Sequence, residues 1–113
     1  MIKVKYKSRK IEKICNDVDE MKKHFGYDKL LVEGLMALLF HFGSMDSIFD
    51  FKTVSYLKGY NLEKIENTNN YSLRIVPKKD KRKDRIILFI ISDDGKEIEI
   101  VDFDSEHRYK LKK

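Results

Sequence analysis

The sequence predicts an α+β domain in the order β-α-α-β-β-β, with a small antiparallel sheet and two helices packed on one face. Three observations support this prediction. Apolar side chains alternate with period 2 near the N-terminus, recur at three- and four-residue steps in the first half, and alternate or run continuously again after residue 70. A chain of 113 residues has the usual size of one domain, so we expect residues 1–113 to fold as a single unit.

The first predicted elements are a strand and a helix at the N-terminus. Apolar and basic side chains alternate over residues 2–7, as in a strand with one buried face. Ser8 then suits the N-cap of a helix, because its hydroxyl can accept a hydrogen bond from the first helical turn. Ile11, Cys15 and Val18 continue this helix at steps of three and four residues, and Gly26 is its expected end.

A second helix is predicted from Asp28 to Phe42, with Gly43 as its stop signal. It is apolar over most of its circumference, so we expect it to be the central packing element. Ser44 suits the cap of a short helical turn over residues 45–50. The Asn-rich stretch that follows, up to residue 70, is expected to be irregular.

The C-terminal half predicts a meander of three strands. Residues 71–76 alternate and are closed by Pro77, which cannot donate to a sheet. Residues 85–91 form an almost continuous apolar run, typical of a central strand covered on both sides. Asp93-Asp94-Gly95 is a hairpin turn signal, and residues 96–102 are expected to pair back as the last strand.

The net charge is +5, and the basic side chains concentrate in three blocks. Residues 1–13 carry six Lys or Arg against one acid, residues 78–85 carry six against two, and residues 108–113 carry four and no acid. If the fold brings these blocks together, they form one electrostatic surface for a polyanion such as a nucleic acid. The alternative interpretation is a solvated lysine-rich exterior.

Cysteine usage and hydropathy predict a protein of the reducing cytoplasm. The lone Cys15 cannot form an internal disulfide and is expected to be a buried thiol. No apolar segment approaches the ~20 residues that span a bilayer, so no membrane contact is expected. His24, His41 and His107 lack metal-binding spacing, and no phosphate-binding glycine loop is present, so we expect neither a metal nor another cofactor.

The remaining chemistry lies on and after the predicted strands. Arg74 alternates with apolar neighbours and should leave the core face, while Arg85 opens the next strand about one hairpin away. His107 and Tyr109 follow the last strand. Metal-free RNA cleavage needs proton transfer at the 2′-hydroxyl and leaving oxygen, and a cation beside the phosphorane. Histidine and arginine can supply these functions. Taken alone, this spacing is more typical of ordinary surface side chains than of a catalytic site.

Several short motifs occur in an order similar to that of one bacterial toxin family. They are Lys10 to Ile14, Tyr60-Asn61-Leu62-Glu63-Lys64-Ile65, Tyr71-Ser72-Leu73-Arg74-Ile75, Asp84-Arg85-Ile86-Ile87-Leu88-Phe89, and Ile98-Glu99-Ile100-Val101-Asp102-Phe103 followed by His107. Together they resemble the HigB branch of the RelE/ParE superfamily over nearly the whole chain. The resemblance implies a RelE-like fold and a single toxin domain over residues 1–113.

The resemblance further implies a toxin of a type II toxin–antitoxin pair that cleaves mRNA in the ribosomal A site. Its partners would be the ribosome, mRNA and a HigA-like helix-turn-helix antitoxin from the same operon. Arg74 and Arg85 match the strand basics that stabilise phosphate, His107 the C-terminal acid or base, and Tyr109 an assisting aromatic. The residues expected to bind RNA by charge are Lys3, Lys5, Lys7, Arg9, Lys78, Lys79, Lys81, Arg82, Lys83 and Arg108.

The chain also departs from the family pattern. Ser105-Glu106-His107 replaces the usual Asp-Tyr-His ending, and residues 63–67 lack the histidine of some members. The connection over residues 77–84 is longer and more basic than usual. Two alternatives therefore stay open: a ParE-like inhibitor of DNA gyrase, and a non-catalytic interaction domain of the same shape.

Overall fold

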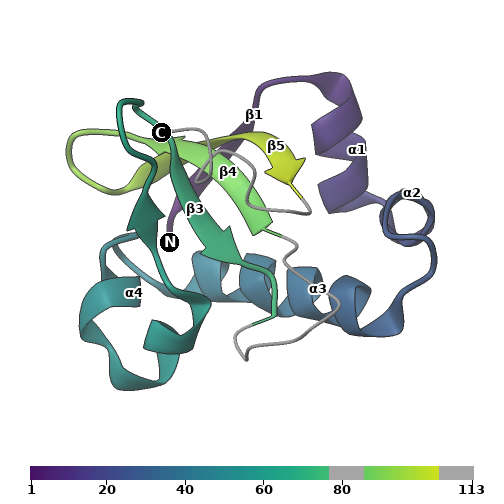
Figure 1. The fold of residues 1–113 in the computed structure, drawn as a ribbon, viewed down its shortest axis with the longest axis horizontal. Coiled ribbons are helices and arrows are strands. Elements are labelled where there is room, and N and C mark those ends of the chain that lie inside the picture. The colour runs from purple at the N-terminus through teal and green to yellow at the C-terminus, as the bar shows by residue number, and fades with distance from the viewer. Residues whose placement is uncertain (77–85, 105–113) are drawn as a thin grey trace.

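The computed structural model describes residues 1–76 and 86–104, with Asp104 described by its backbone alone. A five-stranded sheet packs against helices from the first half of the chain (Figure 1). The elements in chain order are β1 (Lys3–Tyr6), α1 (Arg9–Asn16), α2 (Val18–His24), α3 (Lys29–Ser44), α4 (Asp50–Thr53), the 3₁₀ helix η1 (Ser55–Tyr60), β2 (Glu63–Lys64), β3 (Tyr71–Arg74), β4 (Ile86–Ile91) and β5 (Glu97–Asp104). The α+β class predicted from the sequence is confirmed.

The sheet is mixed, in the order β1-β5-β4-β3-β2. The meander β3-β4-β5 is antiparallel, as predicted, and the short strand β2 extends it beyond β3. β1 instead pairs in parallel with β5, with Lys3 opposite Glu97 and Tyr6 opposite Ile100. The prediction of an antiparallel sheet is therefore wrong for β1, and β2 was not predicted. Parallel neighbours need a long connection, and most of the chain lies between these two strands.

The predicted N-terminal helix is two helices. Ser8 caps α1 as predicted, accepting a hydrogen bond from the Ile11 amide at 3.2 Å. At Asp17 the backbone becomes extended, with φ −126° and ψ 114°. The Asp17 carboxylate accepts hydrogen bonds from the amides of Asp19 and Glu20, so it starts α2. The single helix was a wrong prediction because an aspartate can satisfy backbone amides locally and so competes with helix continuation.

Helix α3 closely matches its prediction, with Asp28 as N-cap and an end at Ser44, one residue beyond Gly43. It passes so close to the sheet that a Cβ at Gly34 would lie 2.6 Å from the carbonyl oxygen of Ile75. The helical turn predicted at residues 45–50 is wrong, because α4 begins only at Asp50. Ser47 instead accepts a hydrogen bond from the Phe49 amide and leads the chain into α4.

One hydrophobic core lies between the helices and one face of the sheet. Leu73, Ile87, Phe89, Ile98 and Ile100 supply its strand side and are at most 1% exposed. Its helix side comes from α1, α2 and α3, among others from Ile11, Ile14, Met21, Leu35, Leu38 and Phe42. Figure 1 shows α3 running beneath the sheet and α1 beside β1. Among the described residues, no helix has both the length and the apolar character required to cross a bilayer.

Candidate functional site

The strand register defines which residues share the sheet face opposite the core, here called the outer face. Arg74 is opposite Ile86, Ser72 is opposite Leu88, and Ile90 is opposite Glu99. Side chains alternate between the two faces of a sheet, so the register assigns the whole set. The outer face comprises Lys3, Lys5, Glu63, Ser72, Arg74, Ile86, Leu88, Ile90, Glu97, Glu99 and Asp102.

Arg74 lies at the end of β3, and its position agrees with the sequence prediction. Its neighbours Leu73 and Ile75 are fully buried in the core, whereas Arg74 is half-buried on the outer face. Within residues 1–76 and 86–104, no hydrogen bond or ion pair involves its guanidinium group. Arg74 is therefore a partly desolvated cation that makes no hydrogen bond through its guanidinium group to the residues that the structure describes.

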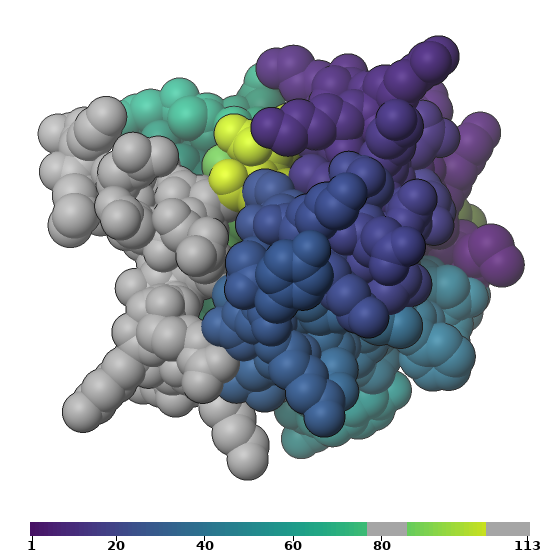
Figure 2. Space-filling model, turned by 90° about the vertical axis from the view of Figure 1, so that its right-hand side faces the viewer, coloured from purple at the N-terminus to yellow at the C-terminus, as the bar shows by residue number. Residues whose placement is uncertain are grey.

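Arg74 belongs to a row of residues that crosses three strands. Arg74 of β3 pairs with Ile86 of β4, and Ile86 pairs with Asp104 of β5. We call this row the Arg74 end of the sheet. The end of β5 is visible in yellow at the molecular surface, beside the N-terminal helices (Figure 2). Residues that are far apart in the sequence thus meet at one end of the sheet.

Most of the other predicted site residues lie outside the described part of the chain. These are Arg85, His107 and Tyr109 of the predicted catalytic set, and Lys78, Lys79, Lys81, Arg82, Lys83 and Arg108 of the predicted RNA-binding set. In the sequence, Arg85 directly precedes Ile86, and His107 follows Asp104 by three residues. Both segments are therefore attached to the row that contains Arg74.

The N-terminal lysines lie elsewhere. Lys3 is opposite Glu97 at the start of β5, and the Lys5 ammonium lies 3.0 Å from the Glu97 carboxylate. Two strands separate β1 from β3, so Lys3 and Arg74 are at least about 14 Å apart across the sheet. Lys7 and Arg9 are exposed where β1 leads into α1. The structure does not bring the N-terminal lysines to Arg74.

The outer face is also not uniformly basic. Its described side chains include the cations Lys3, Lys5 and Arg74 and the carboxylates Glu63, Glu97, Glu99 and Asp102. Three of these carboxylates belong to β5, which lies between the cations of β1 and that of β3. Unbroken positive charge along this face, as a nucleic-acid groove requires, is absent from its described part.

Several reactive side chains are engaged in packing. Cys15 is 7% exposed, and burial raises the pKa of its thiol to about 12, so the thiol stays protonated and is a poor nucleophile. The rings of His24 and Phe103 lie 5.0 Å apart, and those of His41 and Tyr60 lie 5.5 Å apart. Among the residues that the structure describes, no group of three or more His, Cys, Asp or Glu could hold a metal ion.

A pair of exposed aromatic side chains on the surface was not predicted from the sequence. Phe40 of α3 and Tyr56 of η1 are both 74% exposed, on either side of the half-buried His41. The sequence contained a signal for this feature, because α3 is apolar over more of its circumference than one buried stripe requires.

Comparisons of the chain with protein-family models, with curated proteins and with solved structures give no match. The resemblance to the HigB branch therefore rests on the sequence motifs, and the candidate site rests on the strand register and the state of Arg74.

Proposed function

We propose that this protein is the toxin of a toxin–antitoxin pair and cleaves mRNA on the ribosome, with its reaction centre at the Arg74 end of the sheet. The observation that carries the proposal is the row formed by Arg74, Ile86 and Asp104. Arg74 is the member of the predicted catalytic set that the structure describes. Its row contains Ile86, which directly follows Arg85 in the sequence, and Asp104, which lies three residues before His107. The RelE-like topology is part of the same proposal.

In this proposal the reaction needs no metal. The ribose 2′-hydroxyl attacks the adjacent phosphorus, the bond from phosphorus to the 5′-oxygen breaks, and a 2′,3′-cyclic phosphate results. One group removes the hydroxyl proton and another protonates the leaving oxygen. His107 is assigned to proton transfer with help from Tyr109, and Arg74 and Arg85 are assigned to the phosphorane charge.

The environment of Arg74 supports its assignment. A partly buried guanidinium has lost some of its hydration, and a phosphate can restore two hydrogen bonds through its paired oxygens. The described residues supply no carboxylate partner that would have to be displaced first. Partial burial also reduces solvent screening, so the attraction to a phosphorane is stronger than at an exposed site.

The ionic contacts modify the predicted RNA-binding set. Lys5 is already paired with Glu97, so we assign the main phosphate contacts to Lys7, Arg9 and the basic blocks around residues 78–83 and 108. Each phosphate contact releases counterions, so binding to the ribosome should weaken steeply with salt. The assigned antitoxin is a helix-turn-helix protein that covers these basic blocks, and the assigned location is the cytoplasm.

The test is purified protein incubated with mRNA on programmed ribosomes, read by primer extension, with the same mRNA lacking ribosomes as the control. The expected result is cleavage of ribosome-bound mRNA and little cleavage of free mRNA. A parallel supercoiling assay with DNA gyrase separates the alternatives. Intact mRNA together with gyrase inhibition would replace this proposal by the ParE-like activity. Intact mRNA with unaffected gyrase would favour a non-catalytic interaction domain.

A further inference from the structure

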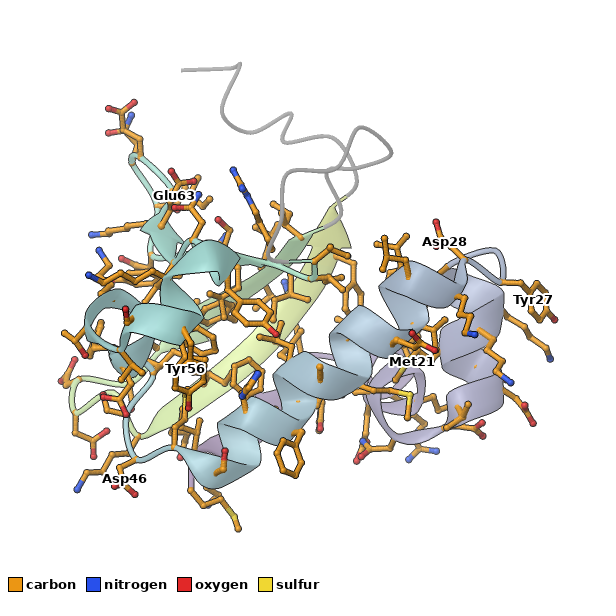
Figure 3. All side chains as sticks on the ribbon, turned by 90° about the horizontal axis from the view of Figure 1, so that it is seen from below. Met21, Tyr27, Asp28, Asp46, Tyr56 and Glu63 are labelled. Atoms are coloured by element: carbon orange, nitrogen blue, oxygen red, sulfur yellow. The ribbon has the colours of Figure 1, made fainter. Side chains whose placement is uncertain are left out.

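Helix α3 has a second apolar side, which faces away from the core. Leu30 is 38% exposed, Met36 46%, and Phe40 and Tyr56 74% each. Figure 3 shows α3 across the near side of the molecule, with Tyr56 next to it and no other helix in front. His41 links the two exposed aromatics, with ring centroids 6.4 Å from Phe40 and 6.2 Å from Tyr56. We define the α3 face as Leu30, Met36, Ala37, Phe40 and Tyr56.

The charge of helix α3 distinguishes it from the rest of this basic protein. Its formally charged side chains are Lys29 and Glu33, which pair with each other at 3.9 Å. The protein as a whole carries a net charge of +5. Two copies of a basic protein repel each other where their positively charged surfaces meet. This repulsion is smallest if they meet through α3, because the formal charges of this helix sum to zero. The same neutrality gives a nucleic acid no attraction to α3.

The exposed apolar area of the α3 face is similar to the apolar area that each partner buries in a standard protein–protein interface. If a large apolar side chain offers about 200 Å², the exposed fractions of Leu30, Met36, Phe40 and Tyr56 give about 450 Å². A standard interface buries ~800 Å² per partner, of which roughly 56–65% is apolar, or about 450–520 Å². Exposed apolar patches of this size on a monomer are often interaction sites.

We propose that the α3 face is a homodimer interface, in which two copies pack their α3 helices antiparallel about a two-fold axis near Ala37. Ala37 is exposed close to the middle of the helix, and its small side chain lets the two backbones approach. The crossing places Phe40 of each copy beside Glu33 and Met36 of the other. A two-fold interface is self-complementary, so each contact occurs twice. This inference is independent of the proposed cleavage activity.

The helix dipoles favour the antiparallel arrangement. At the N-terminal end of α3 the Asp28 carboxylate caps the helix, and Lys29 follows in the first turn, where a positive charge is unfavourable beside the positive end of the helix dipole. In an antiparallel pair, Lys29 instead lies against the C-terminal end of the partner's α3, where the helix dipole is negative. Asp46, which follows two residues after that end, already lies 3.6 Å from the N-terminal ammonium of its own chain, so the helix dipole is the main attraction for Lys29. A parallel pair would instead align the two helix dipoles and place their ends of like sign together.

The first test is the mass of the whole protein by sedimentation equilibrium over a concentration series. The expected wild-type mass is twice the 13.5 kDa of one chain. Phe40→Glu should raise the dissociation constant at least ~30-fold, as expected for loss of an interface hot spot. Val18→Glu is the matched control, because Val18 is 45% exposed on α2 and should leave the dimer intact. A wild-type monomer at about 1 mM, or a dimer insensitive to Phe40→Glu in a folded variant, would overturn the proposal.

Cross-linking tests the arrangement separately. Ala37→Cys should form an intermolecular disulfide on mild oxidation, because residues near the axis come within the ~7 Å that a disulfide tolerates. Ser44→Cys is the control on the same helix. It lies about 10 Å along α3 from Ala37, so the two copies of residue 44 are roughly 20 Å apart in an antiparallel pair. Cross-linking through residue 44 but not residue 37, or through neither in a dimeric sample, would contradict the antiparallel interface.

Discussion

The two ends of the sheet are built in opposite ways. At the hairpin end, residues 92–97, the turn is closed by its own hydrogen bonds: the Ser92 hydroxyl donates to Asp94 at 2.7 Å, and the Gly95 amide donates to the Ser92 carbonyl at 3.0 Å. At the Arg74 end, the guanidinium has no hydrogen-bond or ion-pair partner among the described residues. Polar groups at the hairpin end stabilise the fold, whereas the Arg74 guanidinium makes no such contact with the described residues.

The hairpin end also anchors a distant loop. The Gly95 carbonyl accepts a hydrogen bond from the Ile48 amide at 2.8 Å, and Gly95 itself lies against the side chains of Ser47 and Phe49. This contact joins the β4–β5 turn to the segment that connects α3 to α4. Substitutions at this end should therefore alter stability, whereas substitutions at the Arg74 end should alter function with little change in stability.

Gly95→Ala should give the largest loss of stability, about 2–4 kcal/mol. Gly95 has φ +73°, which disfavours any side chain, and a Cβ there would lie 2.8 Å from both the Phe49 ring and the Ser47 hydroxyl oxygen. Urea denaturation followed by circular dichroism measures the change. Gly43→Ala is the control, because a Cβ at Gly43 meets no atom within 4 Å, and alanine there should be neutral or slightly stabilising. An equal loss of unfolding free energy in Gly95→Ala and Gly43→Ala would contradict the inference that the hairpin end stabilises the fold through Gly95.

Asp94→Asn should give a smaller loss that depends on pH. Hydrogen bonds from the Ser92 hydroxyl and the Lys96 amide hold the pKa of the Asp94 carboxyl below its usual value. Its contribution to stability is therefore complete above the unfolded pKa of about 3.9 and disappears as the pH falls through the lower folded pKa. Urea midpoints of wild type and variant should differ at pH 7 and converge near pH 2. Asp93→Asn, in the same turn, is the control, and a pH-independent difference for Asp94→Asn would contradict the mechanism.

Arg74→Ala should change the free energy of unfolding least, by no more than about 0.5 kcal/mol. The side chain leaves no polar partner unsatisfied among the described residues, and its core neighbours Leu73 and Ile75 stay in place. The same urea titration provides the measurement. A loss comparable to that of Gly95→Ala would show that Arg74 is a structural residue and would remove the contrast between the two ends.

Local chemistry made much of the fold predictable. The alternation over residues 2–7, the cap Ser8, the start of the second helix at Asp28 and the Asp-Asp-Gly turn each depend on a few neighbouring residues, and the structure confirms all of them. The direction of β1 was not predictable, because alternation determines which face is buried and contains no information about the neighbouring strand. The break at Asp17 depended on whether its carboxylate would bond to the backbone, which the helical pattern alone does not decide.

The candidate site was predictable in part for the same reason. Alternation was sufficient to place Arg74 outside the core. The row that joins Arg74 to Ile86 and Asp104 was not predictable, because it depends on the register of three strands and on an irregularity at Leu88 and Phe89. The pairing of Lys5 with Glu97 follows from the unexpected parallel contact of β1 and β5. The sequence therefore indicated which side chains lie outside the core more reliably than it indicated which residues lie next to them in the folded protein.

The most direct test of the contrast is mRNA cleavage on programmed ribosomes by Arg74→Ala and by Lys96→Ala, with circular dichroism to confirm that both variants fold. Each substitution removes one positive charge, from the Arg74 end and the hairpin end of the sheet respectively. Loss of a group that stabilises the transition state costs ~10²–10³ in rate, which is the expected effect of Arg74→Ala. Lys96→Ala should remain within about threefold of wild type, as expected for an exposed charge far from the reaction. A folded Arg74→Ala variant that cleaves mRNA at the wild-type rate would contradict the assignment of function to this end of the sheet.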